Sequence, residues 1–276
     1  MDELLRRFDK VYCQGIEGAY SHIAARQLFP HLQPVFLKSF EEVCMSVSRD
    51  GGSAGILPFE NSTAGIVSGI VRLLLKRDLC VATAKEIRIR HVLCAKNAAP
   101  LSAIERVFSH QQALLQCSEF LSRLDAEQIE TPNTAISAIM ASNDEASAAI
   151  CSEEAAQIYG LEIIEENICN SDNNMTRFIV IARDFAPSPD ADVTSVYFKV
   201  KNESGALFKV LKVFADHGVN LISLHSLPLE DEPWHYGFYV DIEGSLGNEG
   251  ILRSLEEAKE KAQFLRVLGS YRSRRA

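Results

Sequence analysis

The sequence of 276 residues lacks the residue spacings that mark a metal centre or a disulfide framework. Its seven cysteines are odd in number, form no C-x-x-C pair and lie mostly within apolar runs, as reduced thiols of a protein core do. Its seven histidines include no H-E-x-x-H or comparable pair. We therefore expect no metal ligation.

Basic charge is also scarce. The 28 lysines and arginines stand against 37 acidic residues, which gives a net charge of -9. The basic residues are scattered except at the tail (Arg272, Arg274, Arg275), which argues against a surface for nucleic acid or anionic membrane. No segment reads as membrane-spanning, and Met1 to Lys10 is a charged amphipathic stub rather than a signal sequence. We expect a cytoplasmic protein.

What is present is enough apolar sequence for one large domain or two ordinary ones, with 47% hydrophobic residues. The central stretch is GILPFENSTAG, Gly55 to Gly65. Here a buried strand is expected to end at Pro58, and Glu60 to Thr63 bring a carboxylate, an amide and two hydroxyls together before an apolar helix over 66–75. Such a turn can cap the helix or share the helix amides with an anion.

The same plan recurs along the chain. A two-glycine turn, Gln14 to Ser21, precedes a helix for which Ser21 fits the N-cap, and Ser109 heads a helix over 111–121. Two further small-residue turns lie at 131–134 and 148–152. Extended segments at 89–95 and 176–182 predict two crossings between two α/β lobes, with a ligand cleft between the lobes.

The last third of the chain has a different pattern. Ala186 to Asp192 has the composition of a linker. From Thr194 to Tyr271 the periodicity predicts strand, helix, strand, strand, helix, strand. That order is the split βαβ arrangement of a ferredoxin-like α+β domain.

Five motifs in this order closely resemble prephenate dehydratase followed by an ACT regulatory domain: GIEGAYSHIAA (15–25), GILPFENSTAG (55–65), SHQQALLQC (109–117), NNMTRF (173–178) and GALFKVL (205–211). The resemblance covers nearly the whole chain. It implies an α/β catalytic domain over residues 1–185, bilobal like a type 2 periplasmic-binding protein, and a ferredoxin-like ACT domain over 193–272. Lobe 1 would hold about 1–90 and 168–185, and lobe 2 about 91–167.

The implied reaction is the decarboxylating dehydration of prephenate to phenylpyruvate in phenylalanine biosynthesis. Prephenate is a dianion whose ring carboxylate leaves as CO2 while its ring hydroxyl leaves as water. The site therefore needs fixed donors for one carboxylate, an acid or donor at the hydroxyl, and little stabilisation of the departing carboxylate. Aromatisation supplies the driving force, so no cofactor or metal is expected.

The resemblance ties catalysis most directly to Thr176, the threonine of the T-R-F motif. We expect its hydroxyl to donate a hydrogen bond to the leaving oxygen in a dry cleft. Arg177 is the candidate for a substrate carboxylate, since a guanidinium offers two parallel donors, or it braces the cleft. Read without the resemblance, this pair would be the start of a strand followed by a solvated arginine.

Six further residues match the family's motifs. Those matching positions implicated in catalysis or substrate contact are Asn61, Ser109 and Gln116, and those matching positions that line the cleft are Ser21, Ser62 and Thr63. Each has a structural alternative, such as a helix cap for the serines at 21 and 109. His110 is a weaker candidate for a proton donor, and Glu60 is expected to orient the turn.

The regulatory region departs from its family. Members usually carry Glu-Ser-Arg-Pro on the second ACT strand, whereas this chain has His225, Ser226, Leu227 and Pro228. The remaining candidates for an effector pocket between two ACT domains are Gly205, Ala206, Leu207, Asn220 and Leu221. Phenylalanine is the implied effector, and a homodimer or homotetramer is expected.

Three alternatives stay open. Arogenate, with an amine in place of the ketone, could be the substrate on the same fold. Prephenate decarboxylases that do not dehydrate share the scaffold, but the intact T-R-F triplet argues against them. A cleft that only binds an amino acid or organic acid is the non-enzymatic alternative. Some relatives carry an N-terminal chorismate mutase domain, of which Met1 to Lys10 could be a remnant.

Overall fold

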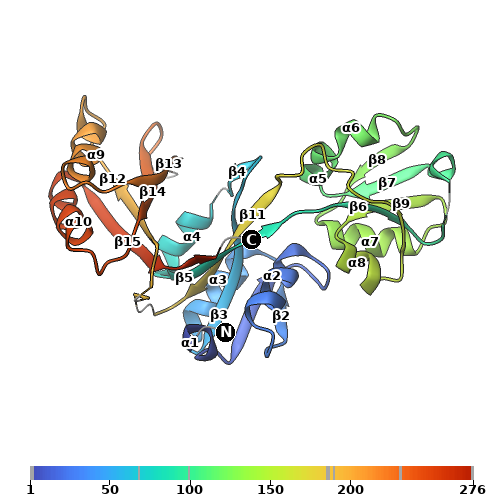
Figure 1. Cartoon of the computed structure of the whole chain (residues 1–276), viewed down its shortest axis with the longest axis horizontal. Helices are drawn as coiled ribbons and strands as arrows, with labels where there is room; N and C mark the ends of the chain where they lie inside the picture. Colours follow the sequence, from blue (N-terminus) through green and yellow to red (C-terminus); the bar gives the residue numbers. More distant parts are fainter. Residues whose placement is uncertain are drawn as a thin grey trace. The chain divides into compact units, whose positions relative to one another are not determined.

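The computed structural model describes residues 3–67, 69–98, 100–184, 187–188, 190–229 and 232–274, so the expected linker at 186–192 and the basic tail lie partly outside the described residues. None of the helices in these ranges is long and apolar enough to cross a membrane. In chain order (Figure 1) the elements are α1 (Glu3–Arg6), β1 (Lys10–Gln14), α2 (Tyr20–Leu28), β2 (Pro34–Leu37), α3 (Phe40–Arg49), β3 (Ser53–Asn61), β4 (Gly65–Ile66), α4 (Ile70–Arg77), β5 (Cys80–Arg88), β6 (Val92–Ala95), the 3-10 helix η1 (Leu101–Ala103), β7 (Arg106–Ser109), α5 (Gln111–Gln116), α6 (Ser118–Leu121), β8 (Glu127–Glu130), α7 (Thr134–Ser142), β9 (Ser147–Cys151), α8 (Glu153–Ile158), β10 (Glu162–Glu165), β11 (Met175–Ala182), β12 (Val193–Lys199), α9 (Ala206–Asp216), β13 (Leu221–Pro228), β14 (Tyr236–Glu243), α10 (Glu249–Lys261), β15 (Phe264–Tyr271) and β16 (Ser273–Arg274).

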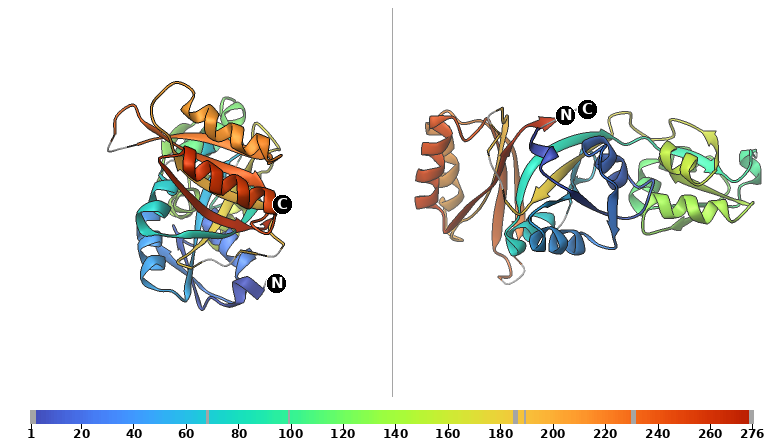
Figure 2. Two further views of the ribbon diagram at one scale, coloured as in Figure 1. Left: turned by 90° about the vertical axis from the view of Figure 1, so that its left-hand side faces the viewer. Right: turned by 90° about the horizontal axis from the view of Figure 1, so that it is seen from below.

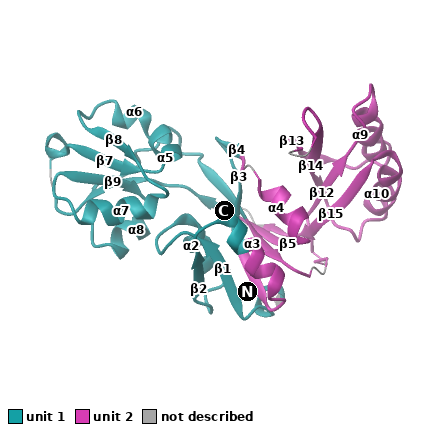
Figure 3. Cartoon of the chain, turned by 180° about the vertical axis from the view of Figure 1, so that it is seen from behind, with its two compact units in different colours: residues 1–43, 56–65, 87–178 teal, residues 44–55, 66–86, 179–276 magenta. Residues whose placement is uncertain are grey.

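Within the described ranges the strands form three sheets. Their orders are β16-β5-β11-β3-β1-β2 with β4 paired to β3, then β10-β6-β9-β7-β8, and β13-β14-β12-β15. The chain divides into two compact units (Figure 3): unit 1 holds residues 1–43, 56–65 and 87–178, and unit 2 holds 44–55, 66–86 and 179–276. The predicted α/β sheets followed by a ferredoxin-like order of elements are confirmed.

The five-stranded sheet of unit 1 is covered on both faces, with α7 and α8 on one and α5 and α6 on the other (Figure 1). Side chains alternate between the two cores along β6: Val92 and Cys94 pack with α7, whereas Leu93 and Ala95 pack with α5. This is the period of two that a strand buried on both faces requires. The alanines of α7 facing this sheet are fully buried, and their small size lets the helix lie close to the strands.

The polar turn after Asn61 joins two strands rather than a strand and a helix. β3 runs through Pro58 to Asn61, and β4 pairs with it. The predictions that Pro58 ends the strand and that the turn caps a helix are therefore wrong. The following helix, α4, begins at Ile70 with Gly69 as its N-cap. Proline removes one N–H donor but its fixed φ is compatible with extended backbone, so the strand continues.

Two serines that were candidates for helix caps lie elsewhere. α2 begins at Tyr20 with Ala19 as N-cap, which places Ser21 inside the first turn, buried. The N-cap of α5 is His110, whose Nδ1 accepts a hydrogen bond from the N–H of Gln112 at 3.2 Å, while Ser109 is the last residue of β7. The helix expected over 111–121 is interrupted at residue 117 and forms α5 and α6.

In unit 2 the four-stranded sheet carries α9 and α10 on one face (Figure 2). Val240 and Ile242 of β14 face these helices in an apolar core. The alternating residues Tyr239 and Asp241 belong to the other face, where the buried Asp241 carboxylate accepts hydrogen bonds from Ser195 Oγ at 2.6 Å and from the Tyr239 hydroxyl. A buried carboxylate needs such donors, because an unpaired one would be costly.

Gly269 of β15 lies against the backbone of β5 within unit 2. A β-carbon built on Gly269 would stand 2.2 Å from the carbonyl oxygen of Val81. We expect Gly269→Ala to lower the free energy of unfolding by about 1–3 kcal/mol, because the backbones of two strands must separate, and to lower Tm by about 2–4 °C per kcal/mol. Gly51→Ala is the matched control, since its nearest atom is Arg183 Nη1 at 4.0 Å. Equal melting temperatures by calorimetry would contradict the expected clash.

Candidate active site

The Asn61 side chain is the centre of the candidate site. Its Oδ1 accepts hydrogen bonds from the backbone N–H of Thr63 at 3.1 Å and of Ala64 at 3.0 Å. A backbone N–H can only donate, so this end of the amide must be the oxygen. The Thr63 hydroxyl lies 2.7 Å from the same oxygen and must therefore donate its own hydrogen to it. This is an Asx turn closed by a second side chain.

The amide nitrogen of Asn61 faces the beginning of β11. Nδ2 lies 2.8 Å from Asn174 Oδ1, 3.0 Å from the carbonyl oxygen of Met175 and 3.0 Å from Thr176 Oγ1. The carbonyl can only accept, which fixes this end of the amide as the nitrogen. Its two hydrogens serve three acceptors, so Thr176 is an acceptor towards Asn61.

Ser62 fastens the turn to the same segment. Its hydroxyl donates to the carbonyl oxygen of Asn173 at 2.9 Å and accepts from the N–H of Met175 at 3.0 Å. The N–H of Ser62 also donates to the Met175 carbonyl at 2.8 Å. The E-N-S-T turn and the N-N-M-T-R-F segment thus form one hydrogen-bonded structure within unit 1.

Gln116, the last residue of α5, joins this structure from a helix that covers the five-stranded sheet. Its Nε2 donates to Thr63 Oγ1 at 3.1 Å. The assignment follows from the turn, because Thr63 has already given its hydrogen to Asn61 and can only accept. Gln116 Oε1 then faces His91 Nε2 at 3.4 Å. Thr63, Gln116 and Asn174 line one pocket of about 240 Å³.

The Thr176 hydroxyl has a hydrogen available for a ligand. Its side chain is buried, and among the described residues its hydrogen bond is the one it accepts from Asn61. Asn174 Nδ2 likewise has no partner among them, although Asn174 is only 2% exposed. Buried donors without acceptors are costly to a protein unless a ligand or water uses them. The pair can donate to an oxygen atom of a bound molecule.

Arg177 follows Thr176 and belongs to an ion pair. Its Nη2 lies 2.8 Å from Glu60 Oε2, and its guanidinium carbon lies 5.1 Å from the centre of the Phe59 ring. The arginine side chain is only 12% exposed. This geometry matches the bracing role, and binding of a carboxylate by Arg177 stays a prediction. Glu60 holds the arginine in place.

Among the described residues, Ser109 and Ser21 make no hydrogen bond to the Asn61 structure. Ser109 is fully buried and its hydroxyl donates to the carbonyl oxygen of Ile150 at 2.7 Å, which links β7 to β9. Ser21 is buried in α2. Their functional roles stay predictions.

The residues predicted to bind an effector lie at the two ends of α9. Gly205 is the N-cap of α9 with a φ of 79°, a conformation that favours glycine, and Ala206 and Leu207 begin the helix. Asn220 and Leu221 follow the other end, where Asn220 Nδ2 donates to Glu243 Oε2 at 2.7 Å. The eleven residues of α9 span about 16 Å, so Gly205 and Asn220 lie far apart within one chain.

Two residues of the site were not predicted from the sequence. Asn174 stands in the NNMTRF motif beside Thr176, and a signal for it was its place in a run of polar residues before a strand. His91 immediately precedes β6 in an otherwise apolar stretch. A histidine in such a stretch was the available signal, but apolar periodicity predicts only that the position is buried and not what the side chain does. Both are at most 3% exposed.

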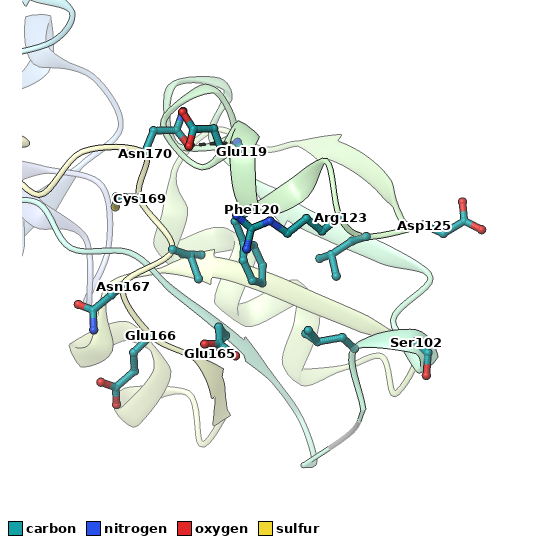
Figure 4. Close-up of a pocket in the computed structure, with 13 residues that line it drawn as sticks. Ser102, Glu119, Phe120, Arg123, Asp125, Glu165, Glu166, Asn167, Cys169 and Asn170 are labelled. Carbon is teal, nitrogen blue, oxygen red and sulfur yellow. Dashed lines mark hydrogen bonds between the residues drawn. The ribbon is translucent and has the colours of Figure 1, made fainter.

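A larger pocket, of about 600 Å³, lies beside α6 (Figure 4). Its lining includes Phe120, Arg123 and Glu165, whereas the Asn61 and Thr176 side chains are elsewhere. It shares Cys169 and Asn170 with the pocket at Gln116. Asn170 holds this segment against α5, since its N–H donates to the Gln116 carbonyl at 2.7 Å.

Cys169 is expected to be the most readily alkylated cysteine. A hydrogen bond from the Cys117 thiol, and one from the N–H of His91, lower its pKa to about 7, whereas burial raises the pKa of Cys13 to about 12. Because the thiolate is the nucleophile, the rate of modification by iodoacetamide should rise from pH 6 to pH 8 and then level off. Peptide mass spectrometry would check this, and earlier labelling of Cys13 would contradict it.

Comparison with known proteins gives two family matches. The family model of prephenate dehydratase matches residues 11–186, and that of the ACT domain matches residues 194–260. A bifunctional chorismate mutase/prephenate dehydratase of Aquifex aeolicus (strain VF5) is 38% identical over 269 residues, covering 95% of this chain and 73% of the relative. Arogenate dehydratase/prephenate dehydratase 2, chloroplastic, of Arabidopsis thaliana is 36% identical over 275 residues, with 95% and 72% covered.

Two solved structures have a similar fold over nearly the whole chain. The prephenate dehydratase of Arthrobacter aurescens in complex with L-Phe has a TM-score of 0.84 at 27% identity, with 95% of this chain and 89% of that chain covered. A protein described as GqqA, a novel type of quorum quenching acylases, has a TM-score of 0.85 at 30% identity, with 95% and 97% covered. The predicted fold class is confirmed by these likenesses and by the ACT match.

Proposed function

The chain belongs to the prephenate dehydratase family, and we propose that it is a hydro-lyase that converts prephenate to phenylpyruvate in phenylalanine biosynthesis. Residues 1–185 form the catalytic domain and residues 193–272 the ACT domain in this proposal. The observation that supports it most directly is the Thr176 hydroxyl, buried and accepting from Asn61. Among the described residues no acceptor takes its hydrogen, so the hydrogen is available to a ligand.

The reaction needs stabilisation of one leaving oxygen. As the ring C–O bond breaks, the bond to the ring carboxylate also breaks, CO2 departs, and its electron pair completes the aromatic ring. The oxygen leaves with the C–O electron pair and becomes water by gaining a proton from solvent. Thr176, with Asn174 as a second donor, would stabilise the charge developing on that oxygen. Donation from Asn61 to Thr176 polarises the threonine O–H and strengthens it as a donor.

Gln116, Ser62 and Thr63 hold the turn that carries Asn61, so in this proposal they position the donors. Arg177 either contacts the side-chain carboxylate of prephenate or braces Asn61 through Glu60. The ion pair with Glu60, at 2.8 Å, favours bracing. Ser109 and Ser21 then support the elements around the site.

Turnover of prephenate is the test of this function. Purified protein incubated with prephenate should release phenylpyruvate, measured by its absorbance in alkali. Arogenate is the second candidate substrate, which the name of the Arabidopsis relative favours, and its product would be phenylalanine, measured by chromatography. A protein inert towards both would contradict the proposal and favour a binding module.

Phenylalanine is the proposed effector, bound between ACT domains of two copies. Gly205 and Asn220 lie at opposite ends of α9, a helix about 16 Å long, so one chain alone does not bring both against a single amino acid. A second copy can place its α9 end beside the first copy's β13, an outer strand of the four-stranded sheet. The structure of the Arthrobacter aurescens relative was determined in complex with L-Phe.

Isothermal titration with phenylalanine checks the effector, and light scattering checks the homodimer or homotetramer. Micromolar binding would show that His225 and Leu227 are tolerated in place of the family's Glu and Arg. Absence of heat, with a dimer still present, would make the ACT domain an assembly module for this chain.

A further inference from the structure

His91 is buried at the entrance to β6 and contacts the candidate site through Gln116. It is 3% exposed, its ring packs edge-on against Tyr20 with ring centres 5.8 Å apart, and its Nε2 lies 3.4 Å from Gln116 Oε1. The Tyr20 hydroxyl in turn donates to the carbonyl oxygen of Arg90. The His91 ring is therefore held by the Tyr20 ring and by the Gln116 amide.

The hydrogen bonds from His91 to Thr176 run in one direction. Asn61 and Thr63 have their donors and acceptors fixed by backbone groups, so Gln116 must turn its nitrogen to Thr63 and its oxygen to His91. A carbonyl oxygen can only accept, so His91 must carry its hydrogen on Nε2. The other ring nitrogen, Nδ1, has no hydrogen-bond partner among the described residues.

We propose that His91 is a positioning residue for the dehydration: as the Nε2–H tautomer it holds the Gln116 amide in the orientation that donates to Thr63, and so it supports the turn that carries Asn61, the donor to Thr176. This rests on the proposed function. With the opposite tautomer, a nitrogen lone pair would face Gln116 Oε1, and the amide would turn over. Thr63 would then meet an oxygen instead of a donor, and its bond to Asn61 would compete with a bond to Gln116.

The environment of His91 keeps it neutral. Burial lowers its pKa to about 4, with the hydrogen bond to Gln116 opposing the shift and the charge of His110 adding to it. At 3.4 Å the hydrogen bond to Gln116 is long for N–H···O. We therefore expect it to set which end of the Gln116 amide faces His91, and to contribute little to stability. A fixed tautomer set by the hydrogen bonds of the ring is a common way for histidine to orient a neighbour.

Two variants and one spectrum test the proposal. His91→Phe keeps the ring packing against Tyr20 but removes the donor, and should lower kcat for prephenate about tenfold or more with KM changed much less. His91→Gln restores an N–H donor and should recover most of the lost kcat. His31→Phe, at an exposed histidine of the same unit, is the control and should match the wild type.

Nitrogen NMR of the wild-type protein, labelled at histidine, reports the tautomer of His91, which side-chain packing alone does not determine. We expect His91 as the Nε2–H tautomer at pH 7. An Nδ1–H tautomer or an imidazolium would overturn the proposal, as would wild-type kcat in a folded His91→Phe variant. If His91→Phe fails to fold, the His91→Gln kinetics and the spectrum still decide. If the wild type does not turn over prephenate, the proposed function fails, and the spectrum alone tests the tautomer.

Discussion

Replacing Thr176 with valine is expected to lower kcat for prephenate by about 10²–10³-fold, the effect typical of removing one donor to a developing oxyanion. Valine has the shape of threonine but no hydrogen to give. The fold should survive, because Asn61 Nδ2 keeps two acceptors, Asn174 Oδ1 and the Met175 carbonyl, for its two hydrogens. The free energy of unfolding should therefore change by only about 1 kcal/mol.

Thr176→Ser is the matched variant, since it keeps the hydroxyl and loses only a methyl group. It should keep kcat within about tenfold of the wild type, because the donor is retained and only its packing is weakened. Steady-state kinetics and thermal melting of both variants give the comparison. Valine kcat near that of the wild type, in a folded protein, would remove Thr176 from the mechanism.

Asn61→Asp is expected to damage both activity and stability, although it changes one group of nearly the same size. The hydrogen bonds that close the turn are kept, since one carboxylate oxygen of the aspartate still accepts from the N–H groups of Thr63 and Ala64. The second carboxylate oxygen, however, would replace the Asn61 amide nitrogen and face three acceptors at 2.8–3.0 Å. Loss of a charged or buried donor typically costs about 1–3 kcal/mol, and kcat should fall about 10²-fold or more.

This substitution has a pH signature with a definite sign. The introduced carboxyl faces acceptors and is disfavoured as an anion, so its pKa should be raised above that of a free aspartate. Protonation supplies one donor again, and stability relative to the wild type should therefore recover as pH falls. Asn133→Asp is the matched control: Asn133 caps α7 by accepting from the N–H of Ile136 at 2.9 Å, a role that aspartate fills equally well. Equal melting losses in the two variants would contradict the assignment of the Asn61 nitrogen.

The sequence allowed the elements of the chain to be predicted well where apolar periodicity is strong. The C-terminal order from β12 to β15 and the strand at Thr176 are confirmed. The grouping of Asn61, Thr63, Gln116 and Thr176 was predicted only through family motifs, because they lie far apart in the chain and no local pattern joins them. Their proximity is now observed, and their catalytic roles stay predictions.

Other features could not be predicted because they depend on tertiary partners. β3 continues through Pro58 since neighbouring strands hold it extended, which outweighs the lost donor. Ser109 satisfies its hydroxyl on β9 instead of capping α5, a choice that sequence spacing does not distinguish. The role proposed for His91 depends on its contact with Gln116, which is 25 residues away in sequence.

The single direction of the hydrogen bonds from His91 to Thr176 limits how this site can evolve. Reversing a donor and an acceptor at one position leaves two like groups facing each other at the next, so the first substitution on such a path is harmful by itself. Viable lineages must change several of these positions together, and losses in double variants should be smaller than the sum of the single losses. Among homologues the five residues should therefore vary as a block, with strong epistasis between positions that never touch.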